Sequence, residues 1–128
     1  MIRRIRTHEA NGLNESLLIN VLDEPGHGGA CHEYQIRRWV RGRGDQYDDE
    51  ELCNIQFQNG PIKEFGVNGV SNEALLAIVA DRLQSFQAGP FMCQENALAL
   101  TSVQDAMMWL ARRTIDRTSR GVEGTNQR

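Results

Sequence analysis

Residues 71–117 read SNEALLAIVADRLQSFQAGPFMCQENALALTSVQDAMMWLARRTIDR, and this stretch decides the fold. Apolar residues recur at intervals of three and four on both sides of Gly89-Pro90, which is the spacing of one face of an α-helix. Ser71 suits the N-cap of the first helix, and Glu73 places a negative charge in its first turn, where the helix dipole favours it. The pattern predicts helices over 71–88 and 94–118. Their expected core residues are Leu75, Ile78, Val79, Leu83 and Phe86 in the first helix and Leu100, Val103, Met107, Leu110 and Thr114 in the second.

The chain before these helices has the pattern of an antiparallel sheet. β-Branched and aromatic residues cluster there and in places alternate with polar ones, as strands require. On the third expected strand this alternation directs Cys53, Ile55 and Phe57 toward the core. The four expected strands cover residues 16–22, 33–40, 52–58 and 62–65.

Glycine and charge mark the connections between these strands. Residues 23–30 read as a loop because they contain Pro-Gly and paired glycines. Asn59-Gly60 is the strongest short hairpin signal in the chain. Residues 41–51 carry a basic block followed by an acidic block and read as a solvated, mobile connection.

The length and composition favour one domain that forms an oligomer. A chain of 128 residues, 40% of them hydrophobic, buries only a modest core and is expected to gain stability as an oligomer. We therefore predict a single α+β domain over residues 1–128. Residues 1–66 are expected to be mainly β-sheet, and residues 119–128 form a C-terminal tail.

The basic residues are almost all arginine, since Lys63 is the only lysine among the 14 Lys and Arg residues. Arginine presents a planar fork of donors that matches phosphate oxygens two at a time. A GC-rich coding sequence would produce the same bias, so composition leaves both explanations open. The net charge is −3 and the pI is about 5.6, which disfavours polymeric nucleic acid as a partner and leaves only a local anion site.

Other function classes lack their signatures. The three cysteines are odd in number and far apart, which does not suit a disulfide framework, and no Cys or His spacing predicts a metal site. The N-terminus lacks the apolar stretch of a signal peptide, and no apolar run could span a membrane, so we expect a cytoplasmic protein with no membrane partner. Nucleophile, metal-pair and phosphate-loop motifs are missing. We therefore expect no catalytic residues and no cofactor.

Arginines extend the apolar stripe of the second helix. At 100° per residue, Arg117 projects about 20° from Leu110 and Arg113 about 60°, whereas Arg112 projects roughly 160° away. A buried arginine must be paired, because an unpaired buried charge costs several kcal/mol. The partner is either a carboxylate of the chain, with Asp105, Asp116 and Glu123 as candidates, or a ligand phosphate. If the end of the helix is exposed to solvent instead, water would also satisfy the charge of the arginine.

Asn96 lies on the same face at the other end of this helix. It is 17 positions from Arg113, which at 1.5 Å per residue is about 25 Å, too far for one small nucleotide to bridge. If both contact one ligand, they belong to different protomers of an antiparallel dimer. Phe86 and Phe91 flank the Gly89-Pro90 turn and either stack a purine or fill the core.

Several segments resemble a known family. They are residues 55–64, 66–79, 86–91 and 95–101, followed by Arg113-Thr114 and by Arg117 with residues 120–125. Together they are similar to the phage anti-Thoeris sponges, the founding Thoeris anti-defence family. The resemblance implies a protein that sequesters cyclic ADP-ribose isomers made by bacterial TIR-domain enzymes, without cleaving them, inside an infected bacterial host. The ligand-binding residues expected from it and from the helix geometry are Phe86, Phe91, Asn96, Arg113, Arg117, Gly121, Glu123 and Thr125.

The resemblance also carries expectations about assembly and further ligands. It implies a pocket shared between two protomers and a homo-oligomer built as a trimer of dimers, that is, a hexamer. Cyclic di- or trinucleotides are possible ligands of a second kind of site, to which no residue is assigned. Two other classes of function stay open from the sequence alone, namely an enzyme that hydrolyses such nucleotides and an inhibitor that binds a host protein.

Overall fold

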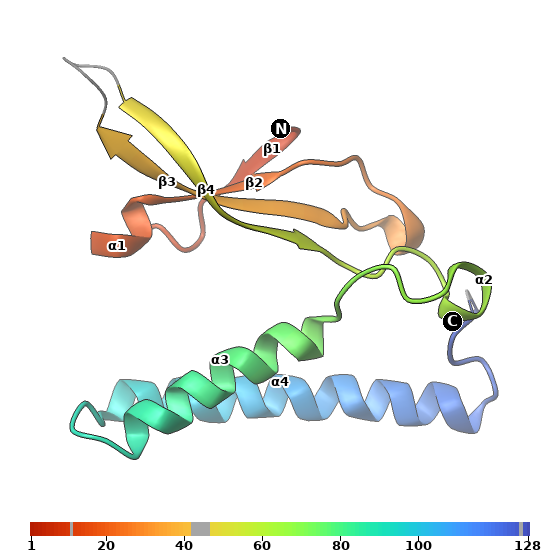
Figure 1. The fold of residues 1–128 in the computed structure, drawn as a ribbon. Helices are drawn as coiled ribbons and strands as arrows, with labels where there is room; N and C mark the ends of the chain where they lie inside the picture. The colour runs from red at the N-terminus through yellow and green to blue at the C-terminus, as the bar shows by residue number, and fades with distance from the viewer. Residues whose placement is uncertain (11, 42–46, 126) are drawn as a thin grey trace. The chain divides into compact units, whose positions relative to one another are not determined.

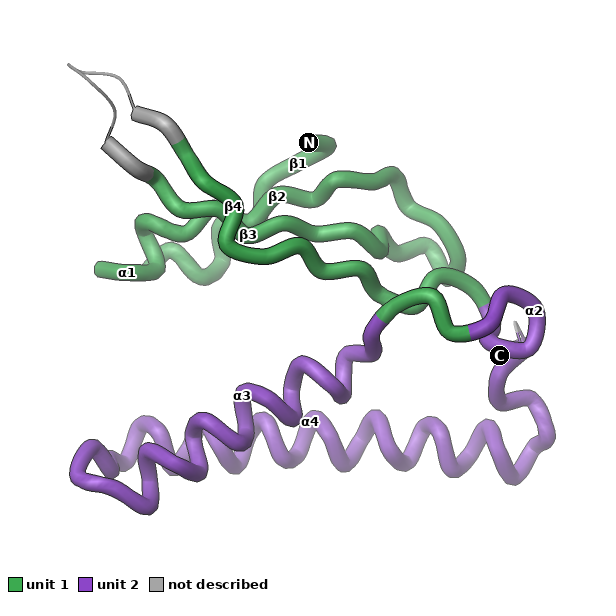
Figure 2. Tube along the Cα trace, in the orientation of Figure 1, with its two compact units in different colours: residues 1–60, 67–69 green, residues 61–66, 70–128 purple. Residues whose placement is uncertain are grey.

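The computed structural model describes residues 1–10, 12–41, 47–125 and 127–128. The chain divides into two compact units. The sheet unit consists of residues 1–60 and 67–69, and the helix unit consists of residues 61–66 and 70–128 (Figure 2). The α+β class, with a four-stranded antiparallel sheet and helices, is confirmed. The expectation of one domain over residues 1–128 stays a prediction.

The sheet unit is a meander with strand order β1-β2-β3-β4, and every neighbouring pair is antiparallel (Figure 1). Ile19 on β2 lies opposite Ile5 on β1 and Ile36 on β3, which fixes the register across the sheet. A register shift follows Ile36 in the pairing of β3 with β4. The elements are β1 (Arg3–Ile5), α1 (Gly12–Glu15), β2 (Leu17–Val21), the 3-10 turn η1 (His27–Gly29), β3 (Glu33–Arg41) and β4 (Tyr47–Gln56).

The segment after β4 differs from the expected strand and hairpin. Residues Ile62–Phe65 form the short helix α2, with Pro61 before it and Gly66 closing it at φ +69°. Asn59-Gly60 does not join two strands, because the Asn68 side chain bonds both the backbone N–H and the carbonyl of Asn59 at 2.8 Å. These side-chain bonds satisfy the backbone groups that a hairpin ladder would have used. The fourth strand is instead β1, at the N-terminus.

The charge blocks around residues 41–51 also have a different structure from the one expected. β3 continues to Arg41 and β4 begins at Tyr47, so the acidic block lies within a strand. Arg37 Nε bonds Asp49 Oδ1 at 3.1 Å, and Arg38 pairs with Glu50 on the same two strands. Opposite charges facing each other across neighbouring strands stabilise their pairing. The expected mobility of residues 42–46 lies outside the described residues.

The core of the sheet unit is small. Leu18 and Val21 of β2 are buried, and Asn20 between them is buried as well. Asn20 accepts from Arg4 Nε and donates to Gln35 Oε1, both at 3.3 Å, so this polar side chain is satisfied. Of the three residues expected to face the core, Ile55 and Phe57 are half-buried, whereas Cys53 is exposed.

The helix unit contains α2 and two long helices, α3 (Asn72–Gln87) and α4 (Gln94–Ser119), which pack against each other as a hairpin (Figure 1). Ser71 caps α3, because its hydroxyl accepts from the backbone N–H of Ala74 at 3.1 Å. Cys93 takes the same place before α4, with its sulfur accepting from the N–H of Asn96. Both helices begin and end within one residue of the predicted bounds.

Apolar side chains occupy two sides of these helices. Half-buried Val103, Met107 and Leu110 lie on one side of α4. On α3, Ile78 and Val79 are exposed rather than part of the packed face. The exposed apolar residues of α4, roughly opposite its half-buried side by helical geometry, are Leu98, Met108, Trp109 and Ile115.

Candidate functional site

Arg117 is buried, with 7% of its surface exposed, and its guanidinium is bonded to the C-terminal tail. Nε donates to Glu123 Oε2 at 3.0 Å. Nη2 donates to the carbonyls of Val122 and Thr125, each at 2.9 Å, and Nη1 donates to the carbonyl of Gln127. Glu123 was one of the three carboxylates considered as its partner, so the charge is satisfied within the chain.

Arg113, one helical turn earlier, is in a different state. It is exposed, and the described part of the chain provides no hydrogen-bond or ion-pair partner for it. The guanidinium of Arg112 stacks on Trp109, with Cζ 5.4 Å from the ring centroid. Arg120 pairs with Asp116 at 3.1 Å and donates to the carbonyl of Arg128. Within the described chain, Arg112 and Arg113 both keep N–H donors available to an anion. By helical geometry, only Arg113 of the two projects toward the packed side of α4.

The tail brings three predicted site residues close to Arg117. Glu123 bonds the guanidinium through its carboxylate, and Thr125 does so through its carbonyl. Gly121 follows the end of α4 in a left-handed conformation, with φ +73°. Its backbone N–H donates to the carbonyl of Thr118. The full set of hydrogen bonds from Arg117 could not be predicted from the sequence. Three of its four acceptors are backbone carbonyls, which are the same at every residue.

Phe86, Phe91 and Asn96 lie at the other end of the hairpin, around the turn that joins α3 to α4 (Figure 1). Phe91 is 74% exposed and Phe86 is 39% exposed, so neither ring fills a core within the chain. The Arg82 guanidinium lies over Phe86, 5.4 Å from the ring centroid. Asn96 is half-buried in the first turn of α4. This end of the hairpin therefore presents aromatic surface, with a positive charge over one of the two rings.

The two groups of predicted residues are separated along one continuous helix. α4 runs without interruption from Gln94 to Ser119. Its rise of 1.5 Å per residue puts Asn96 and Arg113 about 25 Å apart. The structure therefore does not bring the Phe86–Asn96 group and the Arg113 group together within one chain.

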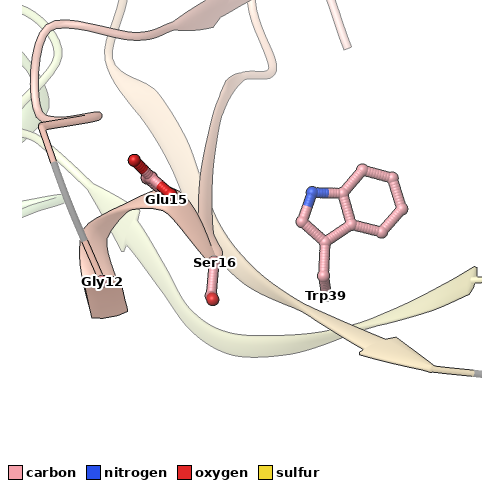
Figure 3. Close-up of a pocket in the computed structure, with 4 residues that line it drawn as sticks. All are labelled: Gly12, Glu15, Ser16 and Trp39. Atoms are coloured by element: carbon pink, nitrogen blue, oxygen red, sulfur yellow. The ribbon is translucent and has the colours of Figure 1, made fainter.

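A separate cavity of about 390 Å³ lies in the sheet unit. It is lined by Gly12, Glu15, Ser16 and Trp39, and Figure 3 shows the Trp39 indole and the Glu15 carboxylate on either side of the Ser16 hydroxyl. Trp39 is 44% exposed. None of the predicted ligand-binding residues lines this cavity. No sequence pattern indicates it, because its residues come from α1, the α1–β2 junction and β3, which are far apart in the sequence.

Asp23 has the clearest electrostatic perturbation in the described chain. Partial burial acts to raise the pKa of its carboxyl group, but hydrogen bonds from the backbone N–H groups of Glu33 and His32 outweigh this effect. The net result is a pKa below the ordinary value of 3.8. The carboxylate stabilises the start of β3 and shows no arrangement that suggests catalysis.

Among the described residues, no group of three or more His, Cys, Asp and Glu side chains could hold a metal ion. Within the same residues, no helix combines the length and the apolar character that a membrane crossing requires. The three cysteines are free thiols.

Comparison with known proteins gives a family match that runs from β4 through most of α4. The sequence profile described as "Acb2/Tad1, hairpin domain" matches residues 49–114, just over half of the chain. Thoeris anti-defense 1 of Bacillus phage SBSphiJ7 is 51% identical over 78 residues, which is 61% of this chain and 55% of that protein, so the chain spans about half the length of this relative. The profile match covers Phe86, Phe91, Asn96 and Arg113. This chain belongs to the Acb2/Tad1 hairpin-domain family.

Proposed function

We propose that this protein binds cyclic ADP-ribose isomers and sequesters them without cleavage, so that the Thoeris defence of an infected bacterium receives no signal. The observation that carries the proposal is the 51% identity to a phage protein named Thoeris anti-defense 1. The alignment covers 55% of that relative, so we propose the same activity for this chain and test it directly.

The chemistry of the predicted site suits such a ligand. Cyclic ADP-ribose isomers carry a pyrophosphate and an adenine base. The free guanidinium of Arg113 can bind phosphate oxygens through two parallel hydrogen bonds. The exposed ring of Phe86 can stack on adenine, and the Asn96 amide offers both a donor and an acceptor to a base edge. Arg117, Gly121, Glu123 and Thr125 complete the proposed site.

We further propose that one pocket contains residues from two protomers. The separation of about 25 Å between Asn96 and Arg113 exceeds the reach of one mononucleotide-sized ligand. An antiparallel pairing of two helix units would bring the start of one α4 close to the end of the other. The exposed apolar residues of α4 support association, since large exposed apolar side chains are often covered at an interface. Dimers are expected to assemble further into a hexamer.

Binding should occur without turnover. A sponge must compete with the host receptor, so a Kd of about 1 nM, or roughly −12 kcal/mol, is expected. The test is isothermal titration with cyclic ADP-ribose isomers, followed by heat release and chromatography of the ligand. The proposal predicts stoichiometric binding and recovery of unchanged ligand. A linearised product in excess over protein would instead identify a hydrolase, and no binding at all would favour a host-protein inhibitor.

The shared pocket can be tested by complementation. Asn96→Ala protomers are co-refolded with Arg113→Ala protomers, and tight sites are counted by titration. In a mixed dimer, one pocket carries both substitutions and the other carries neither, so random pairing should restore about a quarter of all sites. If mass spectrometry shows mixed assemblies but no tight sites return, the two residues do not act across a dimer interface.

A further inference from the structure

The cavity in the sheet unit is held in shape by backbone hydrogen bonds. Ser16 lies at the junction of α1 and β2, and its carbonyl accepts from the backbone N–H of Trp39 at 3.1 Å. The N–H of Ser16 donates to the carbonyl of Leu13 at 2.9 Å, which closes the end of α1. Two walls of the cavity, Ser16 and Trp39, are therefore fixed relative to each other before any ligand binds. Such preorganisation lowers the cost of binding.

The walls of this cavity combine an aromatic ring with polar groups. Its volume of about 390 Å³ lies within the range of roughly 300–1,000 Å³ that is usual for small-molecule sites. Figure 3 shows the Trp39 indole, the Ser16 hydroxyl and the Glu15 carboxylate that line it. Gly12 adds no side chain, and a Cβ atom there would meet nothing within 4 Å. The cavity therefore has room for a small ligand next to the indole.

The charge of the cavity walls is negative. Among the four lining residues, Glu15 alone is ionisable. Its carboxylate is exposed and has no hydrogen-bond or ion-pair partner within the described part of the chain. Asp49 lies opposite Trp39 on β4, but Arg37 Nε pairs with it at 3.1 Å and balances its charge. The uncompensated charge at the cavity is therefore that of Glu15, and a cation would complement it.

We infer that this cavity binds a small alkylammonium ion, with the positive charge close to both the Glu15 carboxylate and the Trp39 indole. A cation over the face of an aromatic ring is attracted by the ring quadrupole, and tryptophan gives the strongest attraction. The Ser16 hydroxyl can hydrogen-bond a polar group of the same ligand. A phosphate-bearing ligand would instead be repelled by Glu15.

This inference does not rest on the proposed function. The lining residues lie between Gly12 and Trp39, whereas the match to the family profile begins at residue 49. The cavity belongs to the sheet unit, and none of its residues is part of the site proposed for cyclic ADP-ribose isomers.

Choline chloride is a suitable probe, and 3,3-dimethyl-1-butanol is its matched control, because the alcohol has the same shape with carbon in place of the charged nitrogen. Labelling with 5-fluorotryptophan gives a ¹⁹F NMR signal for each of the two tryptophans, and Trp109→Phe assigns them. Choline is added to about 50 mM at constant ionic strength, which saturates a site with a millimolar Kd. The Trp39 signal should shift along a saturating curve while the Trp109 signal stays in place. The alcohol should bind at least about tenfold more weakly.

Glu15→Gln tests the carboxylate, since it removes the charge and keeps the shape of the side chain. It should weaken choline binding about three- to tenfold. Glu24→Gln is the matched control, because Glu24 is exposed in the sheet unit and does not line the cavity, and this variant should bind choline like wild type. A Trp39 signal that choline does not move would overturn the inference. Equal binding of choline and the alcohol, or equal affinities of the two glutamine variants for choline, would overturn it as well.

Discussion

The sheet unit has a small buried apolar core, whereas the described helix unit leaves its large apolar side chains half-buried or exposed. In the sheet unit Leu18 and Val21 are buried, and Arg37 pairs with Asp49. In the helix unit Ala80 is the buried apolar side chain among the described residues, and Arg113 has no partner there. An exposed apolar side is unfavourable in water unless another molecule covers it, and an unpaired, exposed arginine keeps its N–H donors open to an anion. This difference supports the proposal that the helix unit provides the binding surfaces.

The largest effect is expected from charging the exposed apolar side of α4. Trp109→Asp combined with Ile115→Asp should weaken self-association by several kcal/mol, because a carboxylate at an apolar interface must be desolvated without a partner. Sedimentation velocity over a range of concentrations measures the change. Leu13→Asp is the matched control, since Leu13 is 74% exposed on α1 in the sheet unit. A wild-type protein that stays monomeric would remove the basis for the comparison.

Arg113→Ala should weaken the binding of a cyclic ADP-ribose isomer by about 1.5–3 kcal/mol, the usual contribution of hydrogen bonds to a charged group. The melting temperature should stay near that of wild type, because the arginine has no partner in the described chain to lose. Arg112→Ala is the control, since its guanidinium already stacks on Trp109. Calorimetry and thermal melting are run on both variants, and equal losses of affinity would argue against a specific role for Arg113.

Gly69→Ala tests the close packing of Gly69 against the backbone of Phe57 in the sheet unit. A Cβ atom at Gly69 would lie 2.4 Å from the carbonyl carbon of Phe57, so the backbone must shift. We expect a loss of about 1–3 kcal/mol in the free energy of unfolding, as for other overpacked sites. In the helix unit, Gly89→Ala is the control, because its nearest neighbour would be 3.5 Å away. Urea denaturation measures both, and similar midpoints would show that the two sites pack alike.

The smallest effect should appear only in acid. The lowered pKa of Asp23 means that the folded state binds its proton more weakly than the unfolded state does. Asp23 therefore contributes stability above its ordinary pKa of 3.8 and loses it as the pH falls through the lower folded value. Asp23→Asn should flatten the dependence of the melting temperature on pH in this acid range. An unchanged acid profile would place the pH dependence in other carboxylates.

The helices were predicted more closely than the strands. Periodicity and caps are local properties, so the Ser71 cap and the bounds of α3 and α4 could be deduced from the sequence. The strand expected over residues 62–65 is the helix α2, because bonds from Asn68, distant in sequence, satisfy the turn at Asn59. The short strand β1 has too few residues to show alternation, and it forms by pairing with β2.

The sequence by itself determined the class of fold, the helical hairpin and the arginines on one face of α4, because these depend on local periodicity. Only the tertiary structure decided how Arg113 and Arg117 differ. Both lie toward the packed side, but Arg117 is surrounded by carbonyls of a tail that folds back, whereas Arg113 stays exposed. Backbone carbonyls are the same at every residue, so no sequence pattern shows which arginine they will surround. The path of the chain in space decides it.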